Sequence, residues 1–161
     1  MMNHYPTLAA VLAMDAQALF DHIACHLIMQ GCACRHVSRD GDVTCLYRDA
    51  QGRACAIGAV LPNELYCAVL EGRSLANLIP FLRYTGPQAA RMLAQFMERH
   101  LGLLAPLQGI HDTHPPSQWP DELSRHARRL GLDTAALQAA LILREAHRPS
   151  RVCEEPADAC A

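Results

Sequence analysis

The segment from Asp15 to Gly31, DAQALFDHIACHLIMQG, constrains the fold more than any other part of the sequence. Its apolar residues recur at helical spacing and form one stripe: Leu19, Phe20, Ile23, Leu27 and Ile28. Asp15 is a suitable N-cap, and Gly31 stands where a helix would end. An amphipathic helix must bury its apolar stripe against other elements, so this segment predicts a globular core built around it.

The cysteine-rich stretch after this helix carries turn and strand signals. RDGD at 39–42 marks a turn, and RDAQGR at 48–53 predicts a hairpin loop with a glycine near its end. We therefore expect strands near 43–48 and 53–58, paired antiparallel, and a weaker strand near 33–37.

Every signal beyond residue 62 is helical. Serine, threonine and aspartate caps precede apolar-periodic segments, and glycines such as Gly102 and Gly131 stand at their ends. Pro106 would start a further helix. The expected fold class is α+β: five to six helices with a small antiparallel β-hairpin, in a single domain over 1–148. The tail 149–161 is poor in apolar residues, so we expect it to be disordered.

Composition excludes several function classes. The net charge is −2 and all fourteen basic residues are arginine, so lysine-dependent chemistry is ruled out. A near-neutral chain lacks the basic footprint of a nucleic-acid-binding protein, and no nucleic acid is expected as a partner. No apolar run approaches the ~20 residues of a membrane span, so no membrane is expected either. The N-terminus makes a poor signal peptide, which favours a cytoplasmic location with reduced cysteines.

The order of landmarks resembles that of a group of small uncharacterised proteins encoded in phages, prophages and bacterial genomes. The motifs are C-x-Y-R from Cys45, G-R-A-C-A-I-G from Gly52, E-G at Glu71, H-D at His111 and W-P-D-E-L from Trp119. The resemblance covers residues 15 to 132. It implies a compact accessory protein of mobile-element origin and assigns no chemistry.

Cys55 is the first candidate for catalysis. A thiol needs a base to become a nucleophile, and His111 is the best placed by sequence order. Asp112 is the obvious third member, but neighbouring side chains diverge by about 100° on a helix, so we expect Glu71 or Asn77 to orient the imidazole instead. The alternative is structural, because ACAIG reads as a buried apolar strand and free cysteine is among the most buried residue types. The structural interpretation is favoured.

Zinc is the second candidate chemistry. A site would draw on Cys32, Cys34, His36 and Cys45, and a looped backbone would be needed to gather them. The paired C-x-x-C knuckles typical of zinc sites are absent from the sequence. We therefore expect no cofactor, with zinc as the alternative.

The His111–Asp112 pair is also similar to the adjacent metal ligands of the HD superfamily of metal-dependent phosphohydrolases. That resemblance would require an upstream histidine and a distant aspartate. The upstream histidine would have to be His22, His26 or His36, because His100 is too close to His111 in the sequence. The distant aspartate would be Asp133. A simpler interpretation places His111 and His114 at the end of a helix, where a cationic imidazole is favourable.

A polar cleft beside CAIG is the third possibility. We expect its ligand-binding residues to come from Tyr47, Arg48, Arg53, Glu71, Arg73 and Trp119. A tryptophan that follows a loop, as Trp119 does, more often anchors that loop to the core than contacts a ligand. The leading hypothesis is a small cytoplasmic accessory or regulatory binding protein that docks a protein or a small ligand. An enzyme using Cys55 or the His111–Asp112 pair is the runner-up, and a zinc-stabilised structural module is third.

The fold should not depend on a metal. Treatment of the purified protein with a chelator is expected to leave its melting temperature unchanged, because a core of this size needs no metal to fold. Stoichiometric zinc in the purified protein, with unfolding on its removal, would contradict this and favour the cysteine–histidine set.

Overall fold

The computed structural model describes residues 5–147. This part of the chain forms seven α-helices, one 3-10 helix and one two-stranded antiparallel sheet. In chain order the elements are α1 (Leu8–Leu12), α2 (Ala16–Gln30), β1 (Arg35–Val37), β2 (Val43–Cys45), η1 (Ala68–Leu70), α3 (Leu75–Thr85), α4 (Gln88–Arg99), α5 (Leu101–Thr113), α6 (Trp119–Leu130) and α7 (Ala135–Ala146). The mostly helical α+β fold class is confirmed. The helix count exceeds the expected five or six.

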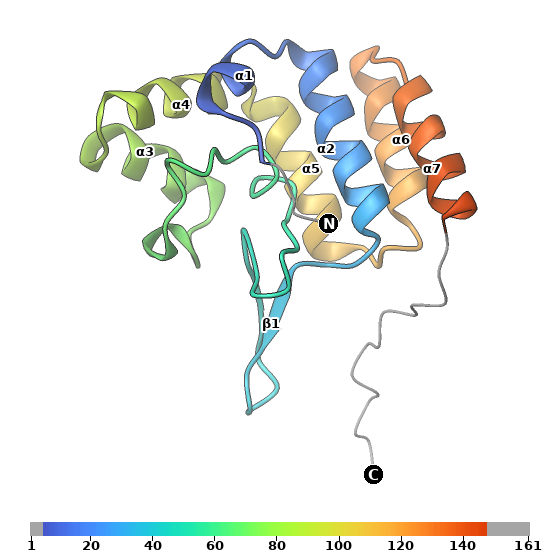
Figure 1. The fold of residues 1–161 in the computed structure, drawn as a ribbon, viewed down its shortest axis with the longest axis horizontal. Helices are drawn as coiled ribbons and strands as arrows, with labels where there is room; N and C mark the ends of the chain where they lie inside the picture. The colour runs from blue at the N-terminus through green and yellow to red at the C-terminus, as the bar shows by residue number, and fades with distance from the viewer. Residues whose placement is uncertain (1–4, 148–161) are drawn as a thin grey trace.

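The α2 helix has the predicted caps and the predicted buried stripe. The Asp15 carboxylate accepts a hydrogen bond from Ala18 N, and Gly31 adopts the left-handed conformation with φ of 63°. All five residues of the stripe are fully buried. α7 packs along α2 on one side of the molecule, and α3 pairs with α4 on the other (Figure 1). α5 contacts both α2 and α4 and joins the two sides.

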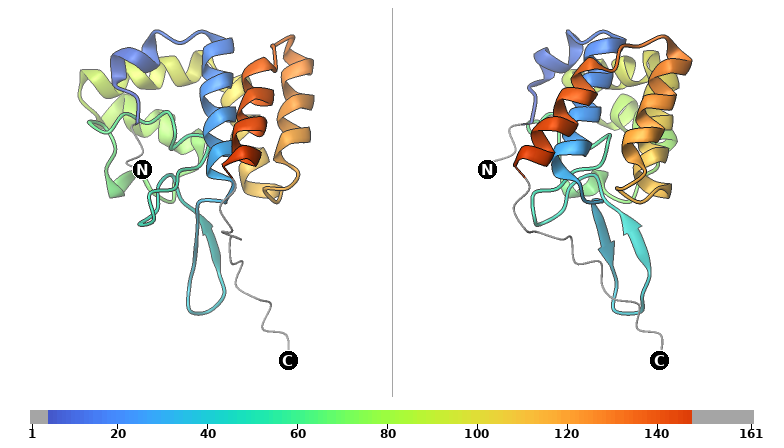
Figure 2. Two further views of the ribbon diagram at one scale, coloured as in Figure 1. Left: turned by 45° about the vertical axis from the view of Figure 1, so that its right-hand side comes forward. Right: turned by 90° about the vertical axis from the view of Figure 1, so that its right-hand side faces the viewer.

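The β-hairpin is a narrow arm that projects from the helical body (Figure 2). Three residue pairs hold it, from Arg35–Cys45 to Val37–Val43, and RDGD forms its turn as predicted. Val37 and Val43 face each other across the hairpin and remain 47% and 58% exposed. The short strand near 33–37 is therefore a partner of β2, although the sequence indicated it only weakly.

The prediction of a hairpin between 43–48 and 53–58 is wrong for its second strand, because residues 53–58 do not form one. Only one bridge, Arg48 with Ala54, joins the two segments. The amide side chain of Gln30 bonds to both main-chain polar groups of Ala54, at 2.8 Å and 2.9 Å, and so occupies the place of a strand. Beyond it the chain coils into successive turns, closed by hydrogen bonds such as Leu61 N to Ile57 O. The apolar run is buried, but as turns.

Two helix boundaries also differ from the prediction. Gly102 does not close α4; it lies in the first turn of α5. Pro106 does not start α5 but stands inside it, five residues after the start. Pro106 lies beyond the first turn, so α5 forgoes the hydrogen bond that an N–H at this position would give to the preceding turn.

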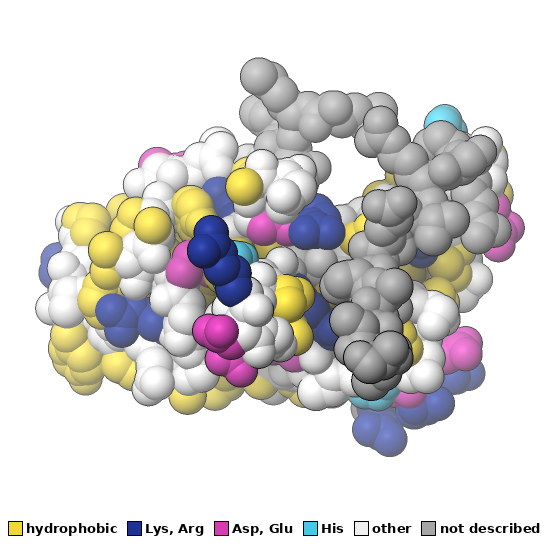
Figure 3. All heavy atoms as spheres, turned by 90° about the horizontal axis from the view of Figure 1, so that it is seen from below, with side chains coloured by type: hydrophobic (Ala, Val, Ile, Leu, Met, Phe, Trp, Pro, Cys, Tyr) yellow, Lys and Arg dark blue, Asp and Glu magenta, His cyan; other side chains and the backbone are white. Residues whose placement is uncertain are grey.

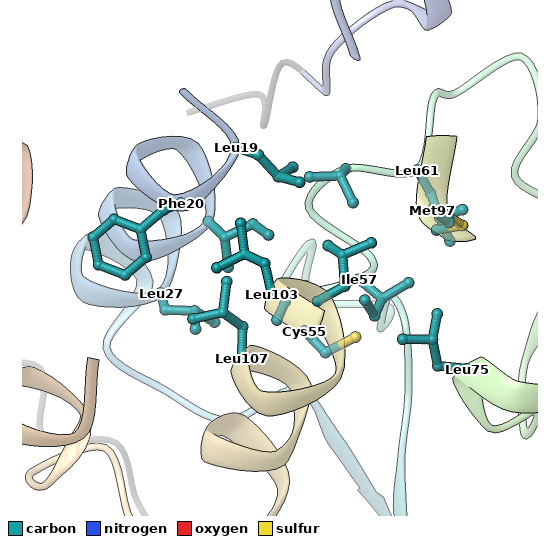
Figure 4. Packing of buried hydrophobic residues seen from close by; sticks show 14 of the residues in the cluster. Leu19, Phe20, Leu27, Cys55, Ile57, Leu61, Leu75, Met97, Leu103 and Leu107 are labelled. Carbon is teal, nitrogen blue, oxygen red and sulfur yellow. The ribbon is translucent and has the colours of Figure 1, made fainter. Parts of the chain in front are cut away.

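The buried apolar side chains form one cluster that joins the turns of 55–61 to the helices. Figure 4 shows Cys55 and Ile57 among Leu103 and Leu107 of α5, with Leu75 of α3 close by. Cys55 is 1% exposed. The prediction that Cys55 belongs to the core is confirmed, in a turn rather than in a strand.

No helix within residues 5–147 is long and apolar enough to cross a membrane. The tail predicted to be disordered, 149–161, lies outside the described residues.

Gly58 should tolerate no side chain. A Cβ there would be forced against the main-chain carbonyl oxygen of Tyr47, which is held in place because it also accepts from Cys55 N at 3.0 Å. Gly58→Ala is expected to lower the free energy of unfolding by more than about 2 kcal/mol, measured by urea denaturation.

Gly109→Ala is the matched control for this prediction. A Cβ at Gly109 meets nothing within 4 Å, and the position is inside α5. The substitution should raise the free energy of unfolding by about 0.5–1 kcal/mol, because alanine is the better helix former. Equal changes in the free energy of unfolding for Gly58→Ala and Gly109→Ala would contradict the close approach of the main chain at Gly58.

Candidate functional site

A cleft of about 290 Å³ opens between the base of the hairpin, the turn before α3 and one face of α5. Apolar side chains form part of its wall. Its polar residues come from all three elements: Cys45, Tyr47, Arg73, Ser74, Gln108 and Asp112. The cleft thus gathers four of the residues that the sequence singled out, Cys45, Tyr47, Arg73 and Asp112, and is the candidate site.

His111 lies behind the cleft and is completely buried. Cys34 N donates a hydrogen bond to His111 Nε2 at 3.0 Å, so Nε2 carries no proton. The proton therefore resides on Nδ1, which lies 2.9 Å from Asp112 Oδ1 and donates to it. The imidazole ring also stacks on Trp119, with ring centroids 5.4 Å apart. His111 is thereby fixed as a neutral ring in one tautomer.

The expectation that Asp112 cannot orient its neighbour is wrong. The divergence of successive side chains holds for their Cα–Cβ directions. The carboxylate still turns back far enough to reach Nδ1, the ring nitrogen closer to the main chain. Neither Glu71 nor Asn77 takes part in a hydrogen bond to this imidazole.

Asp112 presents an ionised carboxylate to the cleft. Oδ1 also accepts from Gln108 Nε2 at 2.8 Å, and Gln108 Oε1 in turn accepts from Ile57 N at 3.1 Å. Burial acts to raise the pKa of Asp112, but the hydrogen bonds from His111 and Gln108 outweigh it and the pKa is lowered. These hydrogen bonds hold the carboxylate in one orientation at the cleft.

Arg35 is the arginine that contacts Asp112, and it does so through the main chain. Its Nη2 donates to the Asp112 carbonyl oxygen at 3.2 Å, and the carboxylate makes no ion pair with any arginine in the described range. The positive charge of the guanidinium acts to lower the pKa of the Cys45 thiol. Burial, followed by the charge of Asp112, raises the pKa of Cys45 to about 11. The thiol in the cleft is therefore protonated at neutral pH.

Arg73 contributes the opposite charge. Its Nε donates to Val69 O at 3.2 Å, and its guanidinium lies 3.9 Å from the centre of the Phe81 ring. Tyr47 links this residue to the cleft, because its hydroxyl donates to the Arg73 carbonyl oxygen at 2.6 Å. Burial raises the pKa of Tyr47, the carboxylates of Glu71 and Asp112 raise it further, and Arg73 opposes them. Both Asp112 and Arg73 thus act on one hydroxyl.

Glu71 and Arg48 brace the loop beside the cleft and do not line it. The Glu71 carboxylate accepts from Tyr47 N at 2.7 Å, Arg48 N at 3.1 Å and the Tyr66 hydroxyl at 2.7 Å. The Arg48 guanidinium donates to the carbonyl oxygens of Gly58 and Leu61 and to Asn63 Oδ1. The charged groups of Glu71 and Arg48 thus form their hydrogen bonds within the protein, and both side chains have a structural role.

Arg53 and Trp119 also lie outside the cleft. Arg53 pairs with Asp49 at 2.5 Å across the RDAQGR turn. Trp119 is fully buried, and its Nε1 donates to the His114 carbonyl oxygen at 2.9 Å, so it anchors the start of α6 to the end of α5. Of the six residues expected to bind a ligand, the cleft includes Tyr47 and Arg73.

Cys55 and His111 do not form a nucleophile–base pair. Cys55 Sγ accepts from Gly58 N at 3.3 Å, while His111 uses Nε2 for Cys34 N and Nδ1 for Asp112. Burial raises the pKa of Cys55 to about 12. A thiol in this setting stays protonated and is closed to substrates.

The hairpin separates two of the residues expected to bind zinc, Cys34 and Cys45. Residues opposite each other in a hairpin share a face, and successive residues alternate. Cys45 is opposite Arg35, whereas Leu46 N bonds to Cys34 O, so Cys45 and Cys34 lie on opposite faces. Cys34 Sγ donates to Arg53 O at 3.3 Å. Among residues 5–147, no group of three His, Cys, Asp or Glu side chains is arranged to hold a metal, and the zinc alternative stays a prediction.

The further ligands of an HD-type site are not assembled around His111 and Asp112. His22 and His26 contact the carbonyl oxygens of Ala59 and Ala54 through Nε2, at 3.0 Å and 3.2 Å. They line a different hollow, of about 760 Å³, between α2 and the turn at 51–53. Asp133 bonds to Ala135 N at the start of α7, and His36 is exposed on the hairpin. His100 lies against Phe96, with the two ring planes tilted by 44°.

Sequence reasoning missed four residues of this region: Arg35, Ser74, Gln108 and Gly109. Gln108 and Gly109 stand in a helix that was expected, in the segment LQGIHD at 107–112 that ends in the His-Asp pair. Nothing in that segment marks the glutamine as the bridge between Ile57 and Asp112, because the contact spans the fold. Ser74 was recognised only as a helix cap, and its hydroxyl makes no hydrogen bond within the described part of the chain.

Comparisons of this chain with family models, with curated proteins and with solved structures gave no match.

Cys55 should react slowly in the native protein. Iodoacetamide is expected to label the exposed Cys67 first and to reach Cys55 only after denaturation, as followed by mass spectrometry of peptides. Cys55→Ala should lower the free energy of unfolding by about 1 kcal/mol through lost packing. Rapid native labelling of Cys55 that His111→Ala suppresses would instead indicate a cysteine enzyme.

Proposed function

We propose that this chain is a non-catalytic binding protein that holds a small ligand in the cleft between the hairpin base, α3 and α5. Such a protein would act as an accessory or regulatory module. The proposal selects the small-ligand form of the leading hypothesis over the docking of a protein.

The orientation of Asp112 carries this proposal. The carboxylate is fixed by His111 and Gln108, both of which are themselves hydrogen-bonded to main-chain groups, at Cys34 N and Ile57 N. Binding sites are concave, with a few polar groups whose positions are fixed by their surroundings. A charged group held in this way and left without an ionic partner at a cleft supports recognition of a ligand.

Protonation of the thiols supports binding over covalent chemistry. Cys45 is the thiol at the cleft, and its pKa of about 11 leaves very little thiolate at neutral pH. His111 has no free nitrogen with which to act as a base toward the cleft. The groups that would be needed for a cysteine mechanism are thus occupied by structural contacts.

The charge of the surrounding surface supports a small polar ligand over a polyanion. Figure 3 views the molecule from the side on which the hairpin projects, and acidic and basic side chains are interspersed there with apolar ones. A polyanion would require a continuous basic patch.

Filling the cleft should abolish ligand binding without harming the fold. Gly109 lines the cleft and has open space at its Cβ position, so Gly109→Leu places a side chain in the cavity. Ligand-observed NMR with a library of small polar metabolites is expected to give hits on the unmodified protein that disappear with Gly109→Leu.

Gly102→Leu is the matched control. Gly102 is in the same helix, also has open space at its Cβ and does not line the cleft. It should keep every hit. The absence of hits on the unmodified protein, or hits that survive Gly109→Leu, would overturn the proposed function.

A further inference from the structure

Two residues of opposite charge line the cleft, Asp112 and Arg73, and among residues 5–147 the only charge-pair contact of Asp112 is with the His111 imidazole. On α5, the Asp112 carboxylate accepts hydrogen bonds from Gln108 and His111. Before α3, the Arg73 guanidinium contacts a carbonyl oxygen and an aromatic ring, and it forms no ion pair with a carboxylate in the described range. Both residues line the same cavity, and the Tyr47 hydroxyl donates to the main-chain carbonyl of Arg73.

The rest of the cleft is small and partly apolar. Leu46 and Leu75 contribute aliphatic side chains, and Ala105 and Gly109 form the wall on α5. The volume of about 290 Å³ lies at the lower limit of ligand pockets, which suits a metabolite smaller than a nucleotide. Ser74 adds a hydroxyl next to Arg73 that has no hydrogen-bond partner in the described structure.

The geometry points to an α-amino acid with an aliphatic side chain as the ligand of this cleft, its ammonium group on Asp112 and its carboxylate on Arg73 and Ser74. This inference rests on the proposed small-ligand function. The aliphatic side chain of the ligand would lie against Leu46, Leu75 and the open wall at Gly109.

Simpler ligands satisfy only part of the cleft. A monoamine would pair with Asp112 and leave the guanidinium of Arg73 without a partner. A dicarboxylate would pair with Arg73 and bring a second negative charge toward Asp112, which is unfavourable in a partly buried site. A zwitterion of amino-acid size would offer a partner to each charge.

The test compares each free aliphatic amino acid with two derivatives that each lack one charge. Alanine, valine, leucine and isoleucine are titrated into ¹⁵N-labelled protein, alongside their N-acetyl forms and their amides. The free amino acid is expected to shift the amide resonances of the cleft, at Leu46, Ser74 and Gly109. N-acetylation removes the ammonium and should weaken binding at least about tenfold, and amidation should weaken it by a similar factor, because each removes a charge-assisted hydrogen bond.

Two variants assign the charges to their residues. Asp112→Asn keeps an oxygen acceptor for His111 and should weaken binding of the amino acid at least about tenfold. Arg73→Gln should weaken the free amino acid but leave the affinity for its amide unchanged. Arg91→Gln on α4, outside the cleft, is the control and should change neither affinity. Melting temperatures establish that each variant is folded.

Failure of this inference is distinguishable from failure of the proposed function. Library hits that depend on Gly109, together with no response to any amino acid, would overturn the amino-acid assignment and leave the binding function in place. Equal affinity for the free amino acid and its N-acetyl form would overturn it too. No hits from any source would overturn both.

Discussion

The hydrogen bond from Cys34 N to His111 Nε2 determines much of what surrounds it. It connects the start of the hairpin to α5, which are 77 residues apart in sequence. Loss of the acceptor would leave a buried main-chain donor unsatisfied, at a cost of about 1–3 kcal/mol. The same bond places the proton of the ring on Nδ1, so that the imidazole donates to Asp112. One structural contact thus sets the orientation of the charged group at the cleft.

The loop that forms the other wall of the cleft has almost no regular secondary structure, so side chains must satisfy its main-chain groups. Glu71 accepts two backbone N–H bonds, and Arg48 donates to two carbonyl oxygens. The tight approach at Gly58 lets the turns of 55–61 lie directly on the Tyr47 main chain. Charged side chains here replace the ladder of hydrogen bonds that a strand would supply.

Local signals were sufficient where the structure depends on local interactions. The α2 helix was predicted with its caps and buried stripe because Asp15, Gly31 and the apolar spacing all act within the helix itself. The hairpin was misplaced because two turn signals competed in sequence. Which turn forms the hairpin depends on distant residues. The Gln30 side chain bonds to the main-chain N–H and C=O of Ala54, and the His111 imidazole accepts a hydrogen bond from Cys34 N. Neither contact has a local signature.

The site shows the same division between local and distant effects. Tyr47, Arg73 and Asp112 stood out by residue type, but their roles follow from tertiary contacts. Glu71 and Arg48 have the same chemistry as cleft residues and are instead fully engaged in bracing the loop. The difference is whether the charged group is engaged in hydrogen bonds within the protein. Composition and sequence spacing do not reveal this. Holding Asp112 and Arg73 at a partly buried cleft without an ion pair to a fixed charge among the described residues costs stability. Sites that carry such a cost are expected where function requires it, and for this reason we propose the charges of the cleft, rather than the more conspicuous Cys55, as the functional surface.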